Sequence, residues 1–71
     1  MRPLTAREIE RVLLLSGFVL ARERGSHKIF RNPTSRIIVP VPFHGGTKPI
    51  PIGTFLAIVR QSKLPKISFT I

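Results

Sequence analysis

Two histidines, His27 and His44, are the side chains of this 71-residue chain that can take up and release a proton near neutral pH. His27 follows the pair Gly25-Ser26, and arginines stand before and after it along the chain: Arg22, Arg24, Arg31 and Arg36. Cleavage of RNA needs a base that activates the ribose 2′-hydroxyl and cations that stabilise the charge on the phosphate. An imidazole among guanidinium groups can supply part of that need. From composition alone, however, a histidine beside a tight turn is more often an ordinary surface residue, so the hypothesis depends on where the fold places the arginines.

Most other catalytic chemistry lacks the residues that it needs. The chain has no cysteine, and its three acidic residues are all glutamates, so a thiolate nucleophile is excluded and a carboxylate pair is unsupported. The loop Gly45-Gly46-Thr47-Lys48 lacks the ending of a phosphate-binding P-loop, and no residues have metal-ligand spacing. We therefore expect no metal and no small-molecule cofactor. Lys48 could contact one phosphate ahead of a helix, and His44 is interpreted as a turn or supporting residue.

The charge balance indicates a polyanionic partner. Lys and Arg number 12 against three acids, which gives a formal net charge of +9, and 42% hydrophobic residues are enough to form a folded core. Nucleic acid and an acidic protein are the natural partners, with an anionic membrane surface third. The longest apolar stretch, residues 12–21, is interrupted by Ser16-Gly17 and is shorter than the roughly 20 residues that cross a bilayer. We expect no membrane association and a cytoplasmic location.

The N-terminal segment has the signals of a helix over about residues 6–16. Thr5 and Glu8 have the spacing of a capping box, and Leu4 can pack onto Ile9. Gly17 suits the position just after the helix.

The tetrad Arg24-Gly25-Ser26-His27 has the Gly-Ser pair of a two-residue type II′ hairpin turn. Such a turn fixes the register, with Arg24 opposite His27 and Ala21 opposite Phe30. Residues 32–35 form a further turn, after which a third strand is predicted from Arg36 to about Val41. Because two prolines in or just after this strand lack N–H groups, it is predicted at a sheet edge.

Alternation along the strands divides their side chains between two faces. The predicted core face collects Val19, Ala21, Phe30, Ile37, Val39 and Val41, with a Glu23–Lys28 pair at its rim. The opposite face collects Leu20, Arg22, Arg24, His27, Ile29, Arg31, Arg36 and Ile38. A register slip of one residue would bury the arginines, which the hydrophobic pattern forbids. The sheet is thus predicted to present His27 among four arginines on the side away from the helices.

A second helix is predicted from Pro51 to about Ser62, with a buried stripe of Ile52, Phe55, Leu56 and Val59. Beyond Leu64-Pro65, residues 66–71 alternate like a strand, which either adds to a sheet edge or stays loose. The expected fold is a single α+β domain over residues 1–71, with a compact core over about 5–64 and a tail at 65–71. Its order α-β-β-β-α, a three-stranded antiparallel sheet with two helices on one face, is the arrangement of double-stranded-RNA-binding domains.

Several of these residues resemble the HicA-type mRNA interferase toxins of bacterial toxin–antitoxin systems. The resemblance covers roughly residues 5–64 and rests on Gly17-Phe18, Arg22, Gly25-Ser26-His27, Phe30, Val39-Pro40-Val41-Pro42, His44-Gly45, Gly53-Thr54, Ile58 and Gln61. It implies a double-stranded-RNA-binding-like fold, metal-independent RNA cleavage, and a HicB-type antitoxin that covers the active histidine. The family's catalytic histidine falls on His27. The chain departs from the family pattern at Pro49-Ile50-Pro51 and in its terminal segment.

The leading hypothesis is a toxin that cleaves mRNA, with His27 as general acid or base. The expected RNA contacts are Arg22, Arg24, Ser26, Lys28, Arg31 and Lys48. A non-catalytic RNA-binding module of the same fold is the alternative, and a basic subunit that pairs only with an acidic protein is a third possibility.

Overall fold

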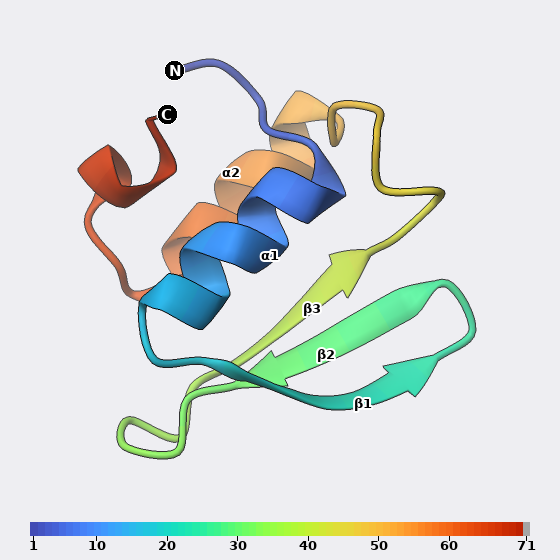
Figure 1. The fold of residues 1–71 in the computed structure, drawn as a ribbon. Coiled ribbons are helices and arrows are strands. Elements are labelled where there is room, and N and C mark those ends of the chain that lie inside the picture. The colour runs from blue at the N-terminus through green and yellow to red at the C-terminus, as the bar shows by residue number, and fades with distance from the viewer. Residues whose placement is uncertain (71) are drawn as a thin grey trace.

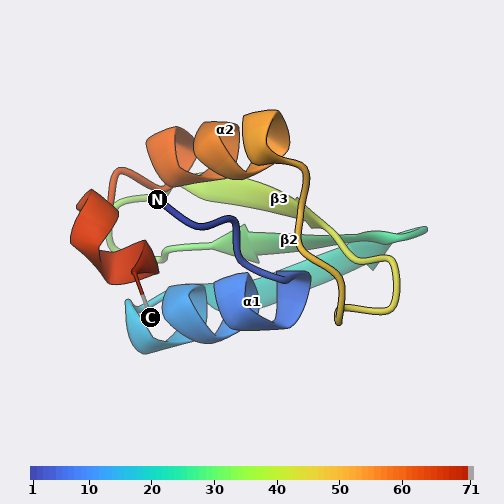
Figure 2. The same ribbon diagram turned by 90° about the horizontal axis from the view of Figure 1, so that it is seen from above.

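The computed structural model describes residues 1–70, and its element order is helix, three strands, helix and a short 3-10 helix (Figure 1). The elements are α1 (Ala6–Leu15), β1 (Val19–Arg24), β2 (His27–Arg31), β3 (Ile38–Pro42), α2 (Ile52–Ser62) and η1 (Lys66–Phe69). The strands form one antiparallel sheet in the order β1-β2-β3, so the predicted α+β class and element order are confirmed. Both helices lie over one face of the sheet, and the β1–β2 hairpin extends past the ends of both (Figures 1 and 2).

Helix α1 begins and ends where the sequence predicts. The Glu8 N–H donates to the Thr5 hydroxyl over 3.1 Å, and the Thr5 N–H donates to the Glu8 carboxylate over 2.9 Å, which completes the capping box. At the other end Gly17 adopts φ +90°, and the Phe18 N–H donates to the Leu13 carbonyl over 2.9 Å. This bond is typical of a glycine-terminated helix. The chain therefore leaves α1 with Phe18 buried and then enters β1.

The hairpin turn is confirmed, but the register beyond it is not. Gly25 has φ +56°, Ser26 has no positive φ, and Arg24 pairs with His27, in keeping with a type II′ turn. A β-bulge between Leu20 and Arg22 then shifts the register, so Leu20 lies opposite Phe30 and the predicted Ala21–Phe30 pair is wrong. Residues 19–21 are all exposed, and Val19 and Ala21 do not join the core. This edge strand extends past the helices, so little packing enforces its alternation.

The third strand is an edge strand, as predicted, but it begins two residues later. The Asn32 carboxamide oxygen accepts from the N–H groups of Thr34 and Ser35, and the Asn32 N–H donates to the Ile37 carbonyl. This local network holds the turn and leaves Arg36 in the left-handed region at φ +66°. Arg36 is therefore a turn residue and does not join the outer face of the sheet.

Helix α2 buries a different stripe from the one predicted. Phe55, Ile58, Val59 and Ser62 are buried, whereas Ile52 is 50% exposed and Leu56 is 38% exposed. Pro51 is the N-cap residue, one position before the helix. The buried stripe lies three residues, nearly one turn, beyond the predicted one. Both sets of residues have helical spacing, so the spacing alone cannot choose between them, and the packing partners decide.

The C-terminal segment is a 3-10 helix and not a strand over the described residues. Phe69 of η1 is completely buried and packs edge-to-face on Phe55, with ring centroids 6.1 Å apart and planes at 82°. Such aromatic pairs stabilise a small core beyond their burial alone. Ile71, which belongs to the predicted tail, lies outside the described residues.

The fold has two helices of 10 and 11 residues. Over residues 1–70, neither these nor any other helix has the length and apolarity required to cross a bilayer.

Candidate nucleic-acid interface

The sheet face turned away from the helices carries His27 and three arginines. His27 lies directly opposite Arg24 on one side and Pro42 on the other. Side chains directly opposite in such a sheet share a face, with Cα atoms about 4.5–5.5 Å apart. Arg22 lies on the same face opposite Ile29, two residues along β2 from His27. We call this surface the outer face and define it by Arg22, Arg24, His27, Ile29, Arg31, Ile38, Pro40 and Pro42.

The parity of β2 decides which way His27 points. Phe30 is completely buried and Lys28 lies on the same side, so the alternate residues His27, Ile29 and Arg31 face outward. His27 is exposed, as are Arg22 and Arg24, while Arg31 is half-buried. Arg31 lies four residues from His27, or about 13 Å along the strand. The two arginines of β1 are therefore the cations nearest to the imidazole.

These outer-face cations are available to a ligand. Within residues 1–70, no ion pair or side-chain hydrogen bond engages the arginines of β1, Arg31 or His27. The three glutamates lie elsewhere: Glu8 caps α1, and Glu10 and Glu23 both contact Lys28. The positive charge of this face is thus not neutralised by the protein itself, which favours a phosphate-bearing partner.

Lys28 lies on the opposite, helix-covered side of the sheet. Its Nζ atom is 3.3 Å from the Glu10 carboxylate and 4.0 Å from that of Glu23. The same ammonium sits 4.0 Å from the centre of the Phe43 ring, a cation–π distance. The structure therefore separates Lys28 from the other predicted RNA contacts and makes it a link between α1, β1 and the loop after β3.

Ser26 links the hairpin turn to that same loop. The Phe43 N–H donates to the Ser26 carbonyl, and the Ser26 side chain is exposed at the tip. A Cβ atom added at Gly25 would meet no atom within 4 Å, so only the positive φ requires glycine there. The turn thus leaves open space beside His27, and its backbone is tied to the residue that precedes His44.

The loop over residues 43–51 is fastened to the start of α1. The Arg7 N–H donates to the Gly46 carbonyl over 3.2 Å, and the Ile50 N–H donates to the Leu4 carbonyl over 2.9 Å. Gly46 is buried with φ +81°, and an added Cβ atom would lie 2.9 Å from Arg7 Cγ and 2.9 Å from Phe43 Cε2. Any other residue type would have to displace the side chains of Arg7 and Phe43 and would also adopt a strained positive φ, so this position favours glycine.

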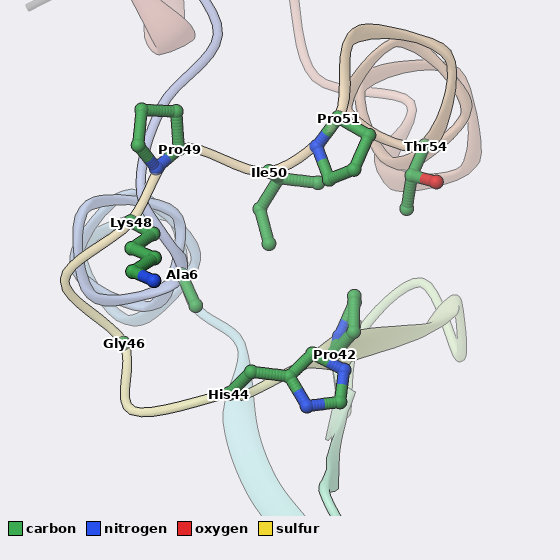
Figure 3. Close-up of a pocket in the computed structure, with 9 residues that line it drawn as sticks. All are labelled: Ala6, Pro42, His44, Gly46, Lys48, Pro49, Ile50, Pro51 and Thr54. Atoms are coloured by element: carbon green, nitrogen blue, oxygen red, sulfur yellow. The ribbon is translucent and has the colours of Figure 1, made fainter.

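The loop, α1, the end of β3 and α2 line a partly open pocket of about 360 Å³ (Figure 3). Lys48 is exposed and lines this pocket together with His44, and so lies apart from the arginines of the hairpin. Pro42 belongs both to the outer face and to the pocket wall. The sequence pattern did not predict this pocket. The available signal was a histidine followed by two glycines and a run of prolines, which shapes a rigid loop.

The side chains present on the outer face are of types that can exchange protons and bind phosphates. Among the described residues there is no group of three or more His, Cys, Asp or Glu that could hold a metal ion. Away from the outer face, the hydrogen bond from the Thr5 N–H holds the pKa of Glu8 below its usual value, and Arg2 acts in the same direction against partial desolvation.

An α-β-β-β-α protein with an open cationic sheet face and a single histidine on it belongs to the class of small basic α+β proteins suited to nucleic acid. Residues 6–64 of the 71 match the family model described as the HicA toxin of bacterial toxin–antitoxin systems, so the chain belongs to the HicA toxin family. This confirms the resemblance found in the sequence and implies an antitoxin partner. Comparison with curated proteins gives no significant match.

Proposed function

We propose that this HicA-family toxin is a metal-independent endoribonuclease that cleaves mRNA, with His27 as its general acid/base. The observation that carries the proposal is the exposure of His27 directly opposite Arg24 on the open face of the sheet. An imidazole can exchange a proton near neutral pH, and a guanidinium is suited to a phosphate. Family membership supplies the independent support.

The reaction follows from the groups at hand. His27 removes the proton of a ribose 2′-hydroxyl, the 2′-oxygen bonds to the adjacent phosphorus, and the bond from phosphorus to the 5′-oxygen breaks. The leaving 5′-oxygen takes a proton from water, and the hydroxide that remains takes the proton held by His27, which regenerates the base. The products are a 2′,3′-cyclic phosphate and a 5′-hydroxyl. General acid–base catalysis of this kind contributes about 10²- to 10⁴-fold. The nucleophile belongs to the RNA, which is why a protein without cysteine or paired carboxylates can do this chemistry.

The arginines of the outer face bind different phosphates of the RNA. Arg24, opposite His27, stabilises the charge on the phosphate that is attacked, and Arg22 holds the next phosphate along the outer face. Arg31 offers a further phosphate contact at the far end of β2, and Ser26 lies at the other end, in the hairpin turn. Lys28 serves the frame behind this face, since it contacts Glu10 and Phe43.

The outer face is also the proposed binding surface for the antitoxin. A HicB-type antitoxin that places acidic residues over the outer face would bind the same cations as RNA and would cover His27. The toxin acts on mRNA, and so in the cytoplasm, when this cover is removed.

The test compares the wild-type protein with His27→Ala on end-labelled RNA. We expect cleavage to fall by about 10²-fold or more while the circular dichroism spectrum and RNA affinity are retained. Arg60→Ala, which removes an exposed arginine of α2, is the control and leaves cleavage unchanged. Undiminished cleavage by His27→Ala would overturn the catalytic role, and wild-type protein that binds RNA but leaves it intact would identify a binding module.

A further inference from the structure

The pocket beside His44 is a partly open, largely apolar hollow that adjoins the outer face at Pro42. Its volume of about 360 Å³ lies at the lower end of the range for small-ligand sites, about 300–1,000 Å³. That size suits a single nucleotide and is too small for a folded stretch of RNA. We propose that this pocket binds one unpaired nucleotide of the RNA substrate, adjoining the bond at His27; the inference rests on the proposed function and names a subsite of it.

The walls of the pocket have the chemistry of a nucleotide site. Apolar surface comes from the rings of Pro42, Pro49 and Pro51 and from the Ile50 side chain, which in Figure 3 points across toward His44. Unpaired bases are held by stacking on flat side chains, among them histidine. The base therefore lies between the His44 imidazole and the proline surface.

The polar groups of the pocket are few and suit the rest of the nucleotide. Lys48 is an exposed ammonium on the same loop as His44. Thr54, in the first turn of α2, turns its methyl group toward the pocket and its hydroxyl away from it (Figure 3). A strongly hydrated ammonium binds a phosphate as a point charge. Lys48 thus holds the phosphate of the bound nucleotide, and Thr54 adds a methyl group to the apolar wall.

The position of the pocket fits a strand that also passes His27. Pro42, which forms one wall, lies directly opposite His27, so the wall is about 5 Å from His27 between Cα atoms. The Phe43 N–H bond to the Ser26 carbonyl keeps the loop and the hairpin turn together. RNA with its cleaved bond at His27 therefore places a neighbouring nucleotide at the pocket.

The pocket is formed before any ligand arrives. Gly46 is buried with its carbonyl accepting from Arg7, and the bond from the Ile50 N–H to Leu4 fixes the far side of the loop. The prolines restrict the backbone further. A rigid site loses little conformational entropy on binding, which favours affinity for a ligand as small as one nucleotide.

The test uses His27→Ala protein, so that RNA and nucleotides stay intact. The protein is titrated with the four ribonucleoside monophosphates and, separately, with ribose 5-phosphate and inorganic phosphate, while amide NMR shifts are followed. We expect nucleotides to shift the amides of Ala6, Gly46 and Thr54, with affinity at least tenfold above that of inorganic phosphate. Equal shifts with phosphate alone would reduce the site to an anion contact of Lys48 and overturn the proposal.

A pocket-filling variant supplies the second arm. Thr54→Trp places a large ring in the pocket from an exposed position of α2, whereas Gln61→Trp adds the same ring at an exposed position outside the pocket. We expect Thr54→Trp, with His27 restored, to raise the KM for RNA at least tenfold and to change which sequences are cut; Gln61→Trp changes neither. Unchanged KM and cleavage sites in Thr54→Trp would overturn the pocket while the ribonuclease proposal stands. If the wild-type protein binds nucleotides in the pocket but never cleaves RNA, the ribonuclease proposal is overturned and the pocket stands.

Discussion

Arg24 is the cation that sits closest to His27 by strand register, and this makes its contribution separable from the general charge. Its guanidinium has no intramolecular partner among the described residues, so its charge is free to bind a phosphate. Arg60 of α2 carries the same charge away from the outer face. A phosphate contact and a distant charge therefore affect RNA binding differently.

We expect Arg24→Ala to weaken RNA binding and to reduce the slope of log K against log salt by about 0.7, the value for one phosphate contact on a single strand. The measurement is RNA affinity at several salt concentrations in the His27→Ala background. Arg60→Ala is the matched control and keeps the slope of its parent. An identical change in both variants would mean that net charge, and not the outer face, determines binding.

Lys28, predicted as an RNA contact, has partners within the protein. Its ammonium contacts Glu10 and Phe43, with 25% of its side chain exposed. We expect Lys28→Ala to lower the free energy of unfolding by about 1 kcal/mol, because both a partly exposed ion pair and a cation–π contact are lost. Urea denaturation checks this value, and the salt slope of RNA binding separates it from Arg24→Ala. A reduced slope in Lys28→Ala, with stability unchanged, would return Lys28 to the RNA contacts.

The capping box at the start of α1 makes the stability of the fold depend on pH. The hydrogen bond from Thr5 lowers the pKa of Glu8, so the ionised form stabilises the folded state. A lowered folded-state pKa means that this stabilisation is present above the unfolded value, about 4.3, and is lost as the pH falls through the folded value.

Glu8→Gln keeps a hydrogen-bonding group at the capping position but removes the titration. We expect wild type to be the more stable protein at pH 6, and its advantage to shrink steadily as the pH falls toward 3. The measurement is urea unfolding of both proteins across this range; the other two glutamates are present in both, so their titration largely cancels. A stability difference independent of pH would show that the charge of Glu8 does not matter.

Local signals predicted the elements well, and long-range packing decided the rest. The capping box and Gly17 fix α1, and the pair Gly25-Ser26 fixes the hairpin next to His27, because each acts within a few residues. The bulge at Ala21 could not be predicted, since β1 is an edge strand with no buried face to enforce alternation. Helical spacing also fits two overlapping stripes of α2, both of which contain Phe55, and only packing in the folded chain decides that Ile58 and Ser62 are buried while Ile52 and Leu56 are exposed.

In the candidate site, too, local sequence predicts some features and the folded chain determines the others. The pairing of Arg24 with His27 follows from the turn alone, whereas Arg36 left the outer face because the Asn32 hydrogen bonds hold it in the turn. The pocket draws on α1, the end of β3, the loop and the start of α2, which come together only in the folded chain. No spacing rule connects such residues in advance.

At the scale of the whole molecule, the three glutamates all lie off the outer face. Glu8 and Glu10 belong to α1, and Glu23 contacts Lys28 from the rim, while the cations of the outer face remain unpaired within residues 1–70. The net charge of +9 attracts the phosphates of RNA and DNA alike. The proposed cleavage, in contrast, needs the 2′-hydroxyl that only ribose carries. Binding and cleavage should therefore respond differently to the 2′-hydroxyl.

This difference yields a test that needs no variant. A single-stranded DNA of the same sequence as a cleaved RNA should bind the protein with a similar salt slope, because the phosphates are the same, yet stay intact because it has no 2′-hydroxyl. Restoring one ribonucleotide at the position of cleavage should restore a cut at that bond alone, with a 2′,3′-cyclic phosphate on its upstream product. Gel electrophoresis and mass spectrometry of the products check both points. Cleavage of the all-DNA strand would require an external nucleophile and would rule out the ribose as nucleophile and His27 as the base that activates it.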